Sequence, residues 1–338
     1  MVKSFEKKNI LVVGGAGFIG SHLCDELVKT AHVLCLDNFL TGTEENIDHL
    51  LSNPDFSFIR HDITEPIDLS DPTYGLAKSK APWQGVQEVY FLASPDARGD
   101  IDRFPVETMM VNSVGLRNAL DLALSSKATF CYVSSDAIYG SLADTASHIK
   151  ETNAGIVRHI DNYSSYAVAQ QFGEAIVETY RRNRGLDVRV ARVFNTYGPR
   201  MTLDATDLVA DYTRRAANGE AILLFGGSEA VSSFCYVTDT VKGLQRIMAA
   251  GDEQPVNIGS DQPVRVMELA QMVMALVGAE VEVVIRSDYT DGHRAHLVPD
   301  ITRAKETLSW FPVTLLKDGL KRTVEDLRAS RGLVHPAA

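Results

Sequence analysis

The chain has 338 residues, of which 45% are hydrophobic and 23% charged, as in a globular protein of one large or two closely joined domains. Its formal net charge of −11 argues against nucleic acid and against an anionic membrane surface as partners, because their phosphates would be repelled. A small anionic ligand is not excluded, since backbone N–H groups and one or two arginines can hold it locally.

Neither a targeting segment nor a membrane span is indicated. The first apolar run begins at Ile10 and breaks at Gly14, too early for a signal peptide, and no stretch approaches about 20 uninterrupted apolar residues. The four cysteines are widely spaced in apolar contexts and form no metal-ligand spacing with the histidines. We therefore expect a cytoplasmic protein with buried, reduced thiols and no metal site.

The first half of the chain alternates short apolar runs with helical patterns, which is typical of a parallel, doubly wound sheet. Long helical patterns at about residues 105–125 and 164–183 separate the fourth from the fifth strand and the fifth from the sixth. The strands are predicted, in chain order, at Ile10–Val13, His32–Asp37, Phe56–Asp62, Glu88–Ala93, Thr129–Ser135 and Val188–Phe194.

Beyond Pro199 the elements become shorter and more mixed. Strands are predicted at Ala221–Phe225 and Phe234–Val237, and helices at Val266–Val277 and Leu315–Arg328. We expect an α/β fold with a Rossmann domain over residues 1–198 and a smaller substrate-binding cap made mainly of residues 199–338. The chain can cross between the two parts, because no sequence break marks the join.

A glycine-rich turn follows the first strand and opens a helix, with Gly14, Gly17 and Gly20 spaced as G-x-x-G-x-x-G. The first permits a tight turn, the second lets backbone approach a pyrophosphate, and the third lets the helix pack on the strand. An ordinary strand-to-helix turn is the alternative, but the second strand then ends in Asp37. A carboxylate there suits the adenosine ribose diol and would repel a 2′-phosphate, so NAD is expected in preference to NADP.

Longer motifs are more specific than these glycines: GGAGFIGSHL, LDNFLTG, HDITEPI, YFLAS, YVSSDAIYG, VRVARVFNTYGPRM, FCYVTD, VNIGS and PDITRAK. With them the chain resembles the extended short-chain dehydrogenase/reductases of the epimerase/dehydratase type, close to UDP-glucuronate decarboxylases and nucleotide-sugar 4,6-dehydratases. The resemblance implies that Asp62 and Ile63 flank the adenine and that Asn195 lies beside the substrate. The cofactor-binding set that it implies is Gly14, Gly17, Phe18, Ile19, Gly20, Asp37, Asn38, Asp62, Ile63, Leu92, Ala93, Ser94, Tyr166 and Gln170.

The resemblance also implies a catalytic Ser at the end of the fifth strand and a catalytic Tyr on the next helix, here Ser135 and Tyr166. A sugar C–H transfers its hydride to the nicotinamide only as the neighbouring hydroxyl loses its proton. The Tyr166 phenolate would accept this proton, and Ser135 would orient the same oxygen. Tyr163 is a second candidate in a poorer register. An unperturbed Tyr has a pKa of about 10, so the phenolate must be stabilised.

In the family a Lys four residues after the Tyr supplies that stabilisation, from one helical turn along the same face. This chain has Gln170 there, which can bind the nicotinamide ribose but brings no charge. The loop after Ser135 departs as well, because Ala137 replaces the Glu that often serves as a base. Asp136 occupies the place where dTDP-glucose 4,6-dehydratases carry a general acid; the alternative is a turn or helix-cap residue.

The residues expected to bind the diphosphate of the substrate also differ from those of the relatives. Relatives usually carry Arg at the positions of Asp207, Ser232 and Leu297, and two of those arginines normally help to hold the diphosphate of a nucleotide sugar. Arg200 and Arg294 remain as candidates for substrate binding. A UDP-sugar diphosphate is therefore expected to bind weakly, and a less charged substrate such as a nucleoside or free glycoside becomes an alternative.

The leading interpretation is an NAD-dependent lyase that transiently oxidises a sugar hydroxyl to a ketone and then eliminates water. Its substrate would be a sugar nucleotide, nucleoside or related glycoside. Alternatives are a UDP-glucuronate-type decarboxylase, a sugar epimerase, or a non-catalytic NAD(H)-sensing protein, which the missing Lys suggests. The two long helices resemble the pair that forms a four-helix dimer interface in this family, so a homodimer is expected.

Overall fold

The computed structural model describes residues 7–74, 76, 81–95, 98–140, 148–157, 162–203, 207–227, 229–251, 254–286 and 297–330. For residues 82, 98, 99, 162, 163 and 330 it describes the backbone only. Within these ranges no helix is long and apolar enough to cross a membrane. The cysteines Cys24, Cys35, Cys131 and Cys235 are all buried free thiols, as the sequence predicts.

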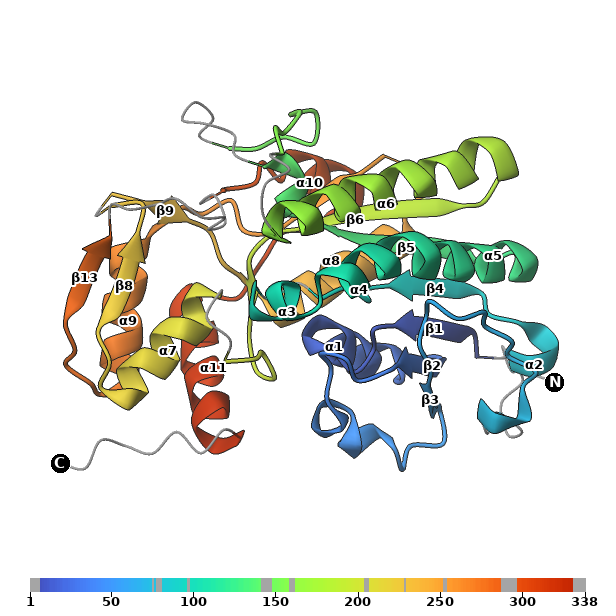
Figure 1. Ribbon diagram of the computed structural model, residues 1–338, viewed down its shortest axis with the longest axis horizontal. Helices are drawn as coiled ribbons and strands as arrows, with labels where there is room; N and C mark the ends of the chain where they lie inside the picture. The colour runs from blue at the N-terminus through green and yellow to red at the C-terminus, as the bar shows by residue number, and fades with distance from the viewer. Residues whose placement is uncertain are drawn as a thin grey trace.

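A seven-stranded parallel sheet forms the centre of the molecule (Figure 1), in the order β11-β6-β5-β4-β1-β2-β3. The first six strands in the chain match the predicted ones to within three residues at each end, and their order reverses at β1, as in a doubly wound Rossmann sheet. The predicted fold class is confirmed. The strands are β1 Asn9–Val13, β2 His32–Asp37, β3 Phe56–Arg60, β4 Glu88–Phe91, β5 Thr129–Ser135, β6 Val188–Val193 and β11 Val256–Ile258.

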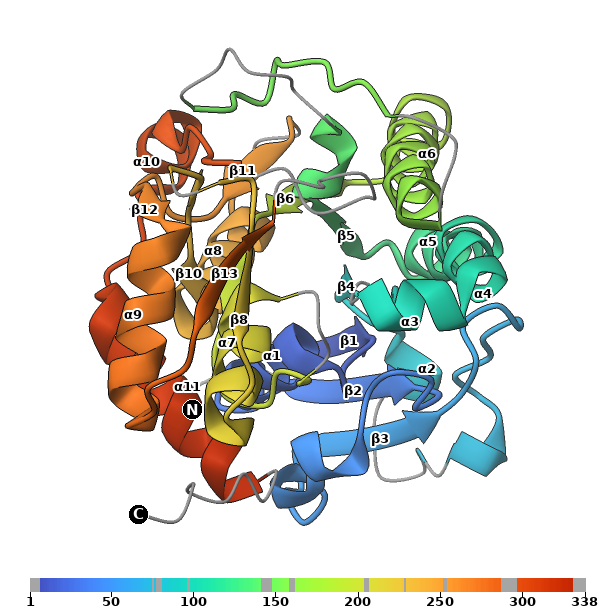
Figure 2. The ribbon, with the colours of Figure 1, turned by 60° about the vertical axis from the view of Figure 1, so that its left-hand side comes forward.

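Both faces of the sheet are covered, because successive side chains of a strand point to opposite faces. In β1, Ile10 and Val12 belong to one apolar core with α1 (Phe18–Leu27) and α8 (Val237–Ala249). Leu11 and Val13 belong to a second core with α5 (Leu116–Ser126) and α6 (Asn162–Arg184). Figure 2 shows α4 (Pro105–Met110), α5 and α6 together on one side of the strands.

The helical pattern predicted at 105–125 is divided in the structure. Its first part is α4 and its last part is α5, and between them Val111–Gly115 form a single π-helical turn. A π turn inserts one extra residue into the helical ladder and occurs frequently at functional sites. Here it directs the buried side chain of Asn112 toward β4 and β5, where Asn112 contacts Ser94 and Tyr132.

The C-terminal half forms a cap and also completes the sheet. In the cap, β8 (Ile222–Phe225) pairs with β13 (Val283–Arg286), and β9 (Val231–Ser232) pairs with β12 (Val264–Arg265). Helices α7 (Leu208–Asn218), α9 (Val266–Val277) and α11 (Leu316–Ser330) lie with β8 and β13 at the left of Figure 1. Because β11 pairs with β6 and α8 packs on the sheet, we propose that the part after residue 198 crosses back into the Rossmann layer.

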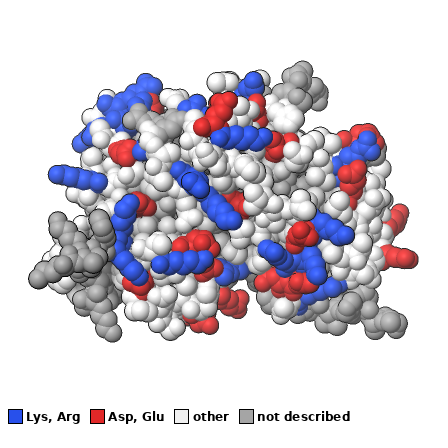
Figure 3. All heavy atoms as spheres, turned by 180° about the vertical axis from the view of Figure 1, so that it is seen from behind, with Lys and Arg blue, Asp and Glu red and all other residues white. Residues whose placement is uncertain are grey.

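Shorter elements connect these parts. They are η1 Glu44–Asn46, η2 Asp48–Leu50, η3 Pro72–Tyr74, α2 Ala81–Gln84, α3 Arg98–Arg103, η6 Asp136–Tyr139, β7 Thr196–Tyr197, β10 Cys235–Tyr236 and α10 Thr302–Leu308. On the face shown in Figure 3, acidic and basic side chains are interspersed. A surface that binds a polyanion would instead gather basic groups.

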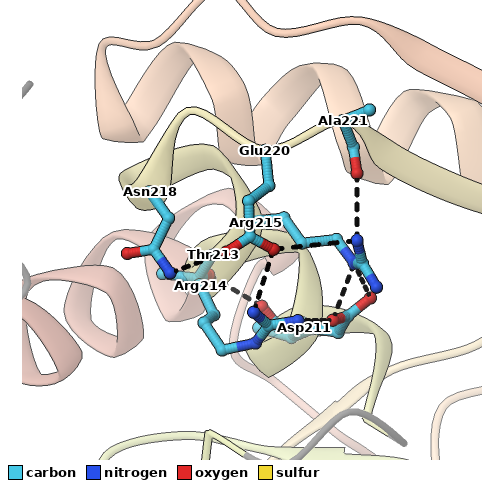
Figure 4. A network of polar contacts seen from close by, with 8 residues as sticks. Asp211, Thr213, Arg214, Arg215, Asn218, Glu220 and Ala221 are labelled. Carbon is cyan, nitrogen blue, oxygen red and sulfur yellow. Dashed lines mark hydrogen bonds and ion pairs between the residues drawn. The ribbon is translucent and has the colours of Figure 1, made fainter.

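A polar network fixes α7 against the start of β8 (Figure 4). The Asp211 carboxylate accepts from Arg214 Nη2 at 2.7 Å and from Arg215 Nε at 2.9 Å. The same two arginines reach the following segment, where Arg214 Nη1 donates to Glu220 at 3.1 Å and Arg215 Nη1 donates to the Ala221 carbonyl at 3.2 Å. The network therefore holds the helix whose N-terminal end carries Asp207.

Candidate functional site

A pocket opens at the carboxyl ends of β1, β2, β4, β5 and β6 and reaches the cap at Asp207. Parallel α/β sheets bind their ligands at this edge, where the strand order reverses. Four predicted site residues lie outside the pocket lining, namely Asp62, Asp136, Asn195 and Arg200. The others line it together: Gly14, Gly17, Phe18, Ile19, Gly20, Asp37, Asn38, Ile63, Leu92, Ala93, Ser94, Ser135, Tyr166 and Gln170.

The glycine turn leaves no room for side chains. Gly14 has φ +82°, and a Cβ there would lie 2.7 Å from the backbone N of Ala93. A Cβ on Gly20 would collide with the carbonyl oxygen of Gly14. Helix α1 begins directly after Gly17, so its unpaired N–H groups and positive dipole end face the turn. The cradle thus fits the pyrophosphate of a dinucleotide.

Asp37 is held in a fixed orientation at the end of β2. Its Oδ2 accepts from the Ala16 N–H at 2.9 Å, and its Oδ1 accepts from the Phe39 N–H at 2.8 Å. Burial raises the pKa of the Asp37 carboxyl, and these backbone donors oppose that change. Since a carboxylate oxygen has more than one lone pair, Asp37 can still accept from ribose hydroxyls in the pocket that it lines.

Asp62 acts on the pocket through a neighbour. Its Oδ2 accepts from Asn38 Nδ2 at 3.1 Å, and its Oδ1 accepts from the backbone and side chain of Thr64. The hydrogen bonds to Thr64 and Asn38 lower the pKa of Asp62 despite its partial burial. Asn38 itself lines the pocket, so Asp62 orients Asn38.

Ser135 and Asp136 form the start of the turn η6. The Ser135 hydroxyl donates to Asp136 Oδ1 at 3.0 Å and accepts from the Ala137 N–H at 3.2 Å, which caps η6. Ser135 lines the pocket, whereas Asp136 is only 3% exposed and lies behind it. Any proton transfer between Asp136 and a ligand in the pocket therefore involves the Ser135 hydroxyl or a shift of the Asp136 carboxylate.

Tyr166 and Gln170 lie one turn apart on α6 and are 4% and 2% exposed. Both line the pocket, as Ser135 does. Tyr166 packs with Ile101, Ala137 and Ala167. The rival candidate Tyr163 belongs to the residues whose side chains are not described.

Two residues that sequence reasoning missed contact Gln170. Tyr132 Oη on β5 lies 2.8 Å from Gln170 Oε1 and 3.0 Å from Asn112 Oδ1. Asn112 Nδ2 in turn donates to Ser94 Oγ at 2.9 Å. The sequence signal was weak: Tyr132 is a hydroxyl-bearing residue in an otherwise apolar strand, and Asn112 lies within a helical pattern. Nothing in the sequence near either residue indicates that it contacts Gln170.

The residues predicted to bind the substrate do not form an anion-binding site. Asn195 Nδ2 donates to the buried Ser232 hydroxyl at 2.9 Å, and Leu297 packs in a small apolar cluster. The guanidinium of Arg200 pairs with Asp25 on α1 at 2.8 Å, and its backbone N–H donates to Asp326 on α11. The structure thus does not bring Arg200 to the pocket, because this ion pair binds it between two helices. Arg294 lies outside the described residues.

The described lining of the pocket carries negative charge. Its charged side chains are Asp37, Asp100 on α3 and Asp207 at the N-terminal end of α7, and it contains neither Lys nor Arg. His61 also lines the pocket, with its Nδ1 beside the Tyr74 hydroxyl at 3.0 Å. Among the residues that the structure describes, no group of three or more His, Cys, Asp or Glu could hold a metal ion.

Comparisons with known proteins agree with this architecture. The family described as GDP-mannose 4,6 dehydratase matches residues 11–323. Among curated proteins, UDP-glucuronic acid decarboxylase 5 of Arabidopsis thaliana is 36% identical over 96% of this chain and 90% of its own length. UDP-glucuronic acid decarboxylase 1 of Xenopus tropicalis is 34% identical over 96% of this chain and 73% of its own.

Two solved structures illustrate the likeness of the fold. UDP-glucose 4-epimerase of Thermotoga maritima, with UDP-glucose, has a TM-score of 0.81 at 29% identity and covers 96% of this chain and 99% of its own. A dTDP-glucose 4,6-dehydratase of Streptomyces venezuelae, with NAD and TYD bound, has a TM-score of 0.81 at 25% identity, over 97% and 99%.

Proposed function

Because the chain belongs to the GDP-mannose 4,6 dehydratase family, within the extended short-chain dehydrogenase/reductases, we propose that it is a lyase that oxidises a sugar hydroxyl and then eliminates water. It is an NAD-dependent enzyme of the extended short-chain dehydrogenase/reductase type, and NAD is its cofactor. The observation that carries the proposal is that the dinucleotide cradle, Ser135 and Tyr166 line the same pocket.

When bound, NAD would supply the hydride acceptor for the oxidation and, after water has left, the hydride donor that reduces the unsaturated product, so the complete cycle needs no second redox partner. Tyr166 takes the proton of the sugar hydroxyl, and the Ser135 hydroxyl hydrogen-bonds the same oxygen and fixes its direction. The ketone that results acidifies the adjacent carbon, so a proton can leave there while a hydroxyl departs from the next carbon. Asp136 would protonate that hydroxyl. The proton would pass by way of the Ser135 hydroxyl, which is hydrogen-bonded to Asp136, or directly after a shift of the carboxylate.

Decarboxylation is the second candidate, and the curated relatives support it, since they carry that activity in their names. Oxidation next to a carboxylated carbon produces a β-keto acid, which loses carbon dioxide without a base. Ala137 in place of Glu would therefore harm a decarboxylase less. Against it stands the described lining of the pocket, which contains neither Lys nor Arg to attract a glucuronate carboxylate and a diphosphate. An epimerase remains the third candidate.

The residues on the expected substrate side also affect which substrate can bind. Ser232 is bonded to Asn195 and Leu297 is packed in an apolar cluster, so neither can pair with phosphate as an Arg would. We propose that a nucleoside or glycoside with little negative charge binds better than a UDP-sugar. A sugar nucleotide is the alternative, and it would need cations outside the described lining.

Product analysis by mass spectrometry tests the proposal. The holoenzyme is incubated with UDP-glucuronate, UDP-glucose, dTDP-glucose and a set of free nucleosides and glycosides, with Tyr166→Phe as the inactive control. Loss of water supports dehydration, loss of carbon dioxide supports decarboxylation, and an isomer of equal mass supports epimerisation. A product that forms equally well with Tyr166→Phe would contradict the proposed role of Tyr166.

We also propose that the protein is a cytoplasmic homodimer. Large apolar side chains are exposed on α4 (Val106, Met109 and Met110) and on α6 (Phe172), and these two helices pack on each other. Exposed large apolar side chains on two helices that contact each other are typical of a protein interface. The four buried free thiols are consistent with a reducing compartment.

A further inference from the structure

Two side-chain amides and a phenol form a buried polar network beside the pocket. Asn112 Nδ2 uses both of its hydrogens, because it donates to Ser94 Oγ at 2.9 Å and to the Thr108 carbonyl at 3.0 Å. A carbonyl only accepts, so the Asn112 amide has one possible orientation, in which its Oδ1 is the acceptor for Gln170 Nε2 at 3.4 Å. Tyr132 Oη lies 2.8 Å from Gln170 Oε1. The network is therefore anchored to the backbone at its Asn112 end.

The same geometry fixes the Gln170 amide. The Tyr132 hydroxyl has one hydrogen, and Gln170 Oε1 is nearer to it than Asn112 Oδ1, which lies at 3.0 Å. Burial raises the pKa of Tyr132, so the hydroxyl keeps this hydrogen at neutral pH. Gln170 Nε2 gives one hydrogen to Asn112, and its second hydrogen has no acceptor among the residues that the structure describes. Gln170 therefore offers one N–H to a ligand in the pocket that it lines.

The fold makes room for the phenol on α6. A Cβ on Gly173 would collide with Tyr132 Oη, so the glycine allows the hydroxyl to reach the helix. Tyr132, Gln170 and Asn112 are each at most 2% exposed. Buried polar side chains that satisfy one another in this way set a unique geometry, because water does not compete for their hydrogen bonds.

The network lies on the side of the pocket away from the expected adenosine site. In the sheet, β1 separates β2, which ends in Asp37, from β4 and β5. A dinucleotide with its adenosine at Asp37 and its pyrophosphate at the glycine turn after β1 therefore extends its second ribose toward β4 and β5. Tyr132 belongs to β5, and Ser94 follows β4. Gln170 lines the pocket together with Ser94, so its N–H can donate to a hydroxyl of that ribose.

A second observation points to a polar ligand at this end of the pocket. Ser134 lies two residues after Tyr132, on the same face of β5, and it lines the pocket. Its buried hydroxyl has no hydrogen-bond partner within the part of the chain that the structure describes. Since buried polar groups are nearly always paired, polar atoms of a ligand are expected near the end of β5.

We propose that Tyr132 is a positioning residue for the cofactor: its hydroxyl holds the Gln170 amide so that Gln170 donates to the ribose on the nicotinamide side. The hydroxyl acts on the cofactor only through Gln170. The adenosine and the pyrophosphate contact other parts of the pocket, the end of β2 and the glycine turn, and do not depend on this hydroxyl. The proposal rests on the assignment of NAD and not on which sugar reaction follows.

Nucleotides of increasing length test the proposal. ADP ends at the pyrophosphate, ADP-ribose adds the second ribose, and NAD adds the nicotinamide ring. Calorimetry on the full chain, freed of bound nucleotide, measures the affinity for each in the native protein and in Tyr132→Phe. We expect Tyr132→Phe to weaken the binding of NAD and of ADP-ribose about three- to tenfold, which is the range of one hydrogen bond, and to change the binding of ADP by less than about twofold.

A double-mutant cycle shows whether the hydroxyl acts through Gln170. Gln170→Met keeps the length of the side chain and removes the amide, so it should weaken NAD binding by itself. In the Gln170→Met background, Tyr132→Phe should have no further effect on NAD, because the group that the hydroxyl holds is absent. The matched control is Tyr139→Phe, which removes another buried phenol hydroxyl, bonded to Asn257 Oδ1 at 2.7 Å and outside the described lining of the pocket. It should leave the ratio of NAD to ADP affinity at the native value.

Several results would overturn the proposal. Unchanged NAD affinity in Tyr132→Phe would show that the hydroxyl has no part in cofactor binding, and equal weakening of NAD and ADP would show that it supports the fold as a whole. Weaker NAD binding with unchanged ADP-ribose binding would exclude the ribose as the group bound. An effect of Tyr132→Phe that is undiminished in the Gln170→Met background would exclude a role through Gln170.

A second variant reaches the same hydroxyl from the helix. If thermal denaturation shows that Tyr132→Phe does not fold, Gly173→Ala displaces the phenol from α6 and should weaken NAD and ADP-ribose but not ADP. An unchanged ratio of NAD to ADP affinity in Gly173→Ala would contradict the proposal. These affinities are measured without a sugar substrate. Failure to find water loss in the product analysis therefore leaves them unaffected, and the two proposals fail separately.

Discussion

Replacing Gln170 by Lys should move the pH dependence of sugar oxidation toward neutral pH. If Tyr166 accepts the proton as a phenolate, a cation on the next turn of α6 favours its charged form. In the native chain the described lining of the pocket offers neither Lys nor Arg, so we expect the phenolate to depend mainly on the nicotinamide charge and on hydrogen bonds. The rate of oxidation should therefore rise further into the alkaline range than in an enzyme that has the Lys.

The size of the shift follows from the geometry of α6. Side chains four residues apart start about 5–6 Å from each other at their Cβ atoms. At an effective dielectric constant of about 20, opposite charges about 5 Å apart attract by about 3 kcal/mol. One pKa unit corresponds to about 1.4 kcal/mol, so the upper limit is about two units. Burial of the new ammonium opposes part of this, because Gln170 is only 2% exposed, and we expect about one to two units.

Single-turnover oxidation provides the assay. Holoenzyme is mixed with the substrate identified by product analysis, and the rise in nicotinamide absorbance is recorded between pH 6 and pH 10, a range set by the pKa of about 10 of an unperturbed Tyr. Gln170→Met is the matched control and should keep the native profile at a lower rate. Tyr166→Phe should abolish the oxidation, whereas Tyr163→Phe should retain much of it.

Two results would refute the reasoning. Full oxidation by Tyr166→Phe would show that the proton acceptor is a different group. An unchanged profile in Gln170→Lys would mean either that proton transfer at Tyr166 does not limit the rate or that another group already stabilises the phenolate.

Three further predictions concern the cofactor, the substrate and the assembly. NAD should bind more tightly than NADP. The affinity for NAD should also fall on acidification, when Asp37 becomes protonated. Because burial raises the pKa of Asp37, this loss should begin at a higher pH than it would for an exposed Asp. Calorimetry from pH 7.5 to pH 5, with Asp37→Asn as a control that lacks this dependence, checks both statements, and equal NADP affinity would contradict them. UDP-glucuronate and UDP-glucose should bind weakly, and Asp207→Arg should improve the affinity for both at least about tenfold at low salt, because it adds a cation to the pocket lining. Low-micromolar affinity of the native chain in calorimetry would show that other cations replace the lost arginines. The chain should be a dimer by light scattering at micromolar concentration, and Phe172→Glu on α6 should shift it toward monomer, whereas a native monomer would exclude the α4–α6 interface.

Much of the architecture is local enough to be predicted from the sequence. The strand from His32 to Asp37 and the helix from Val266 to Val277 have the predicted bounds, because their side-chain periodicity and flanking residues act within a few positions. The glycine turn is equally local, since Gly14 needs a positive φ and a close backbone neighbour. The absence of a Lys at position 170 is visible directly, and so is the loss of three expected arginines.

Only the tertiary structure decides what surrounds those residues. Gln170 meets Tyr132 and Asn112 because a strand, a π turn and a helix from three separate parts of the chain converge, and no short-range pattern encodes that meeting. In the same way, Arg200 is directed to Asp25 by the packing of α1 and α11, and residues 256–258 join the sheet beside β6. Hydrogen bonds and ion pairs depend on distances in space of a few ångströms, whereas sequence patterns report only on the chain near each residue.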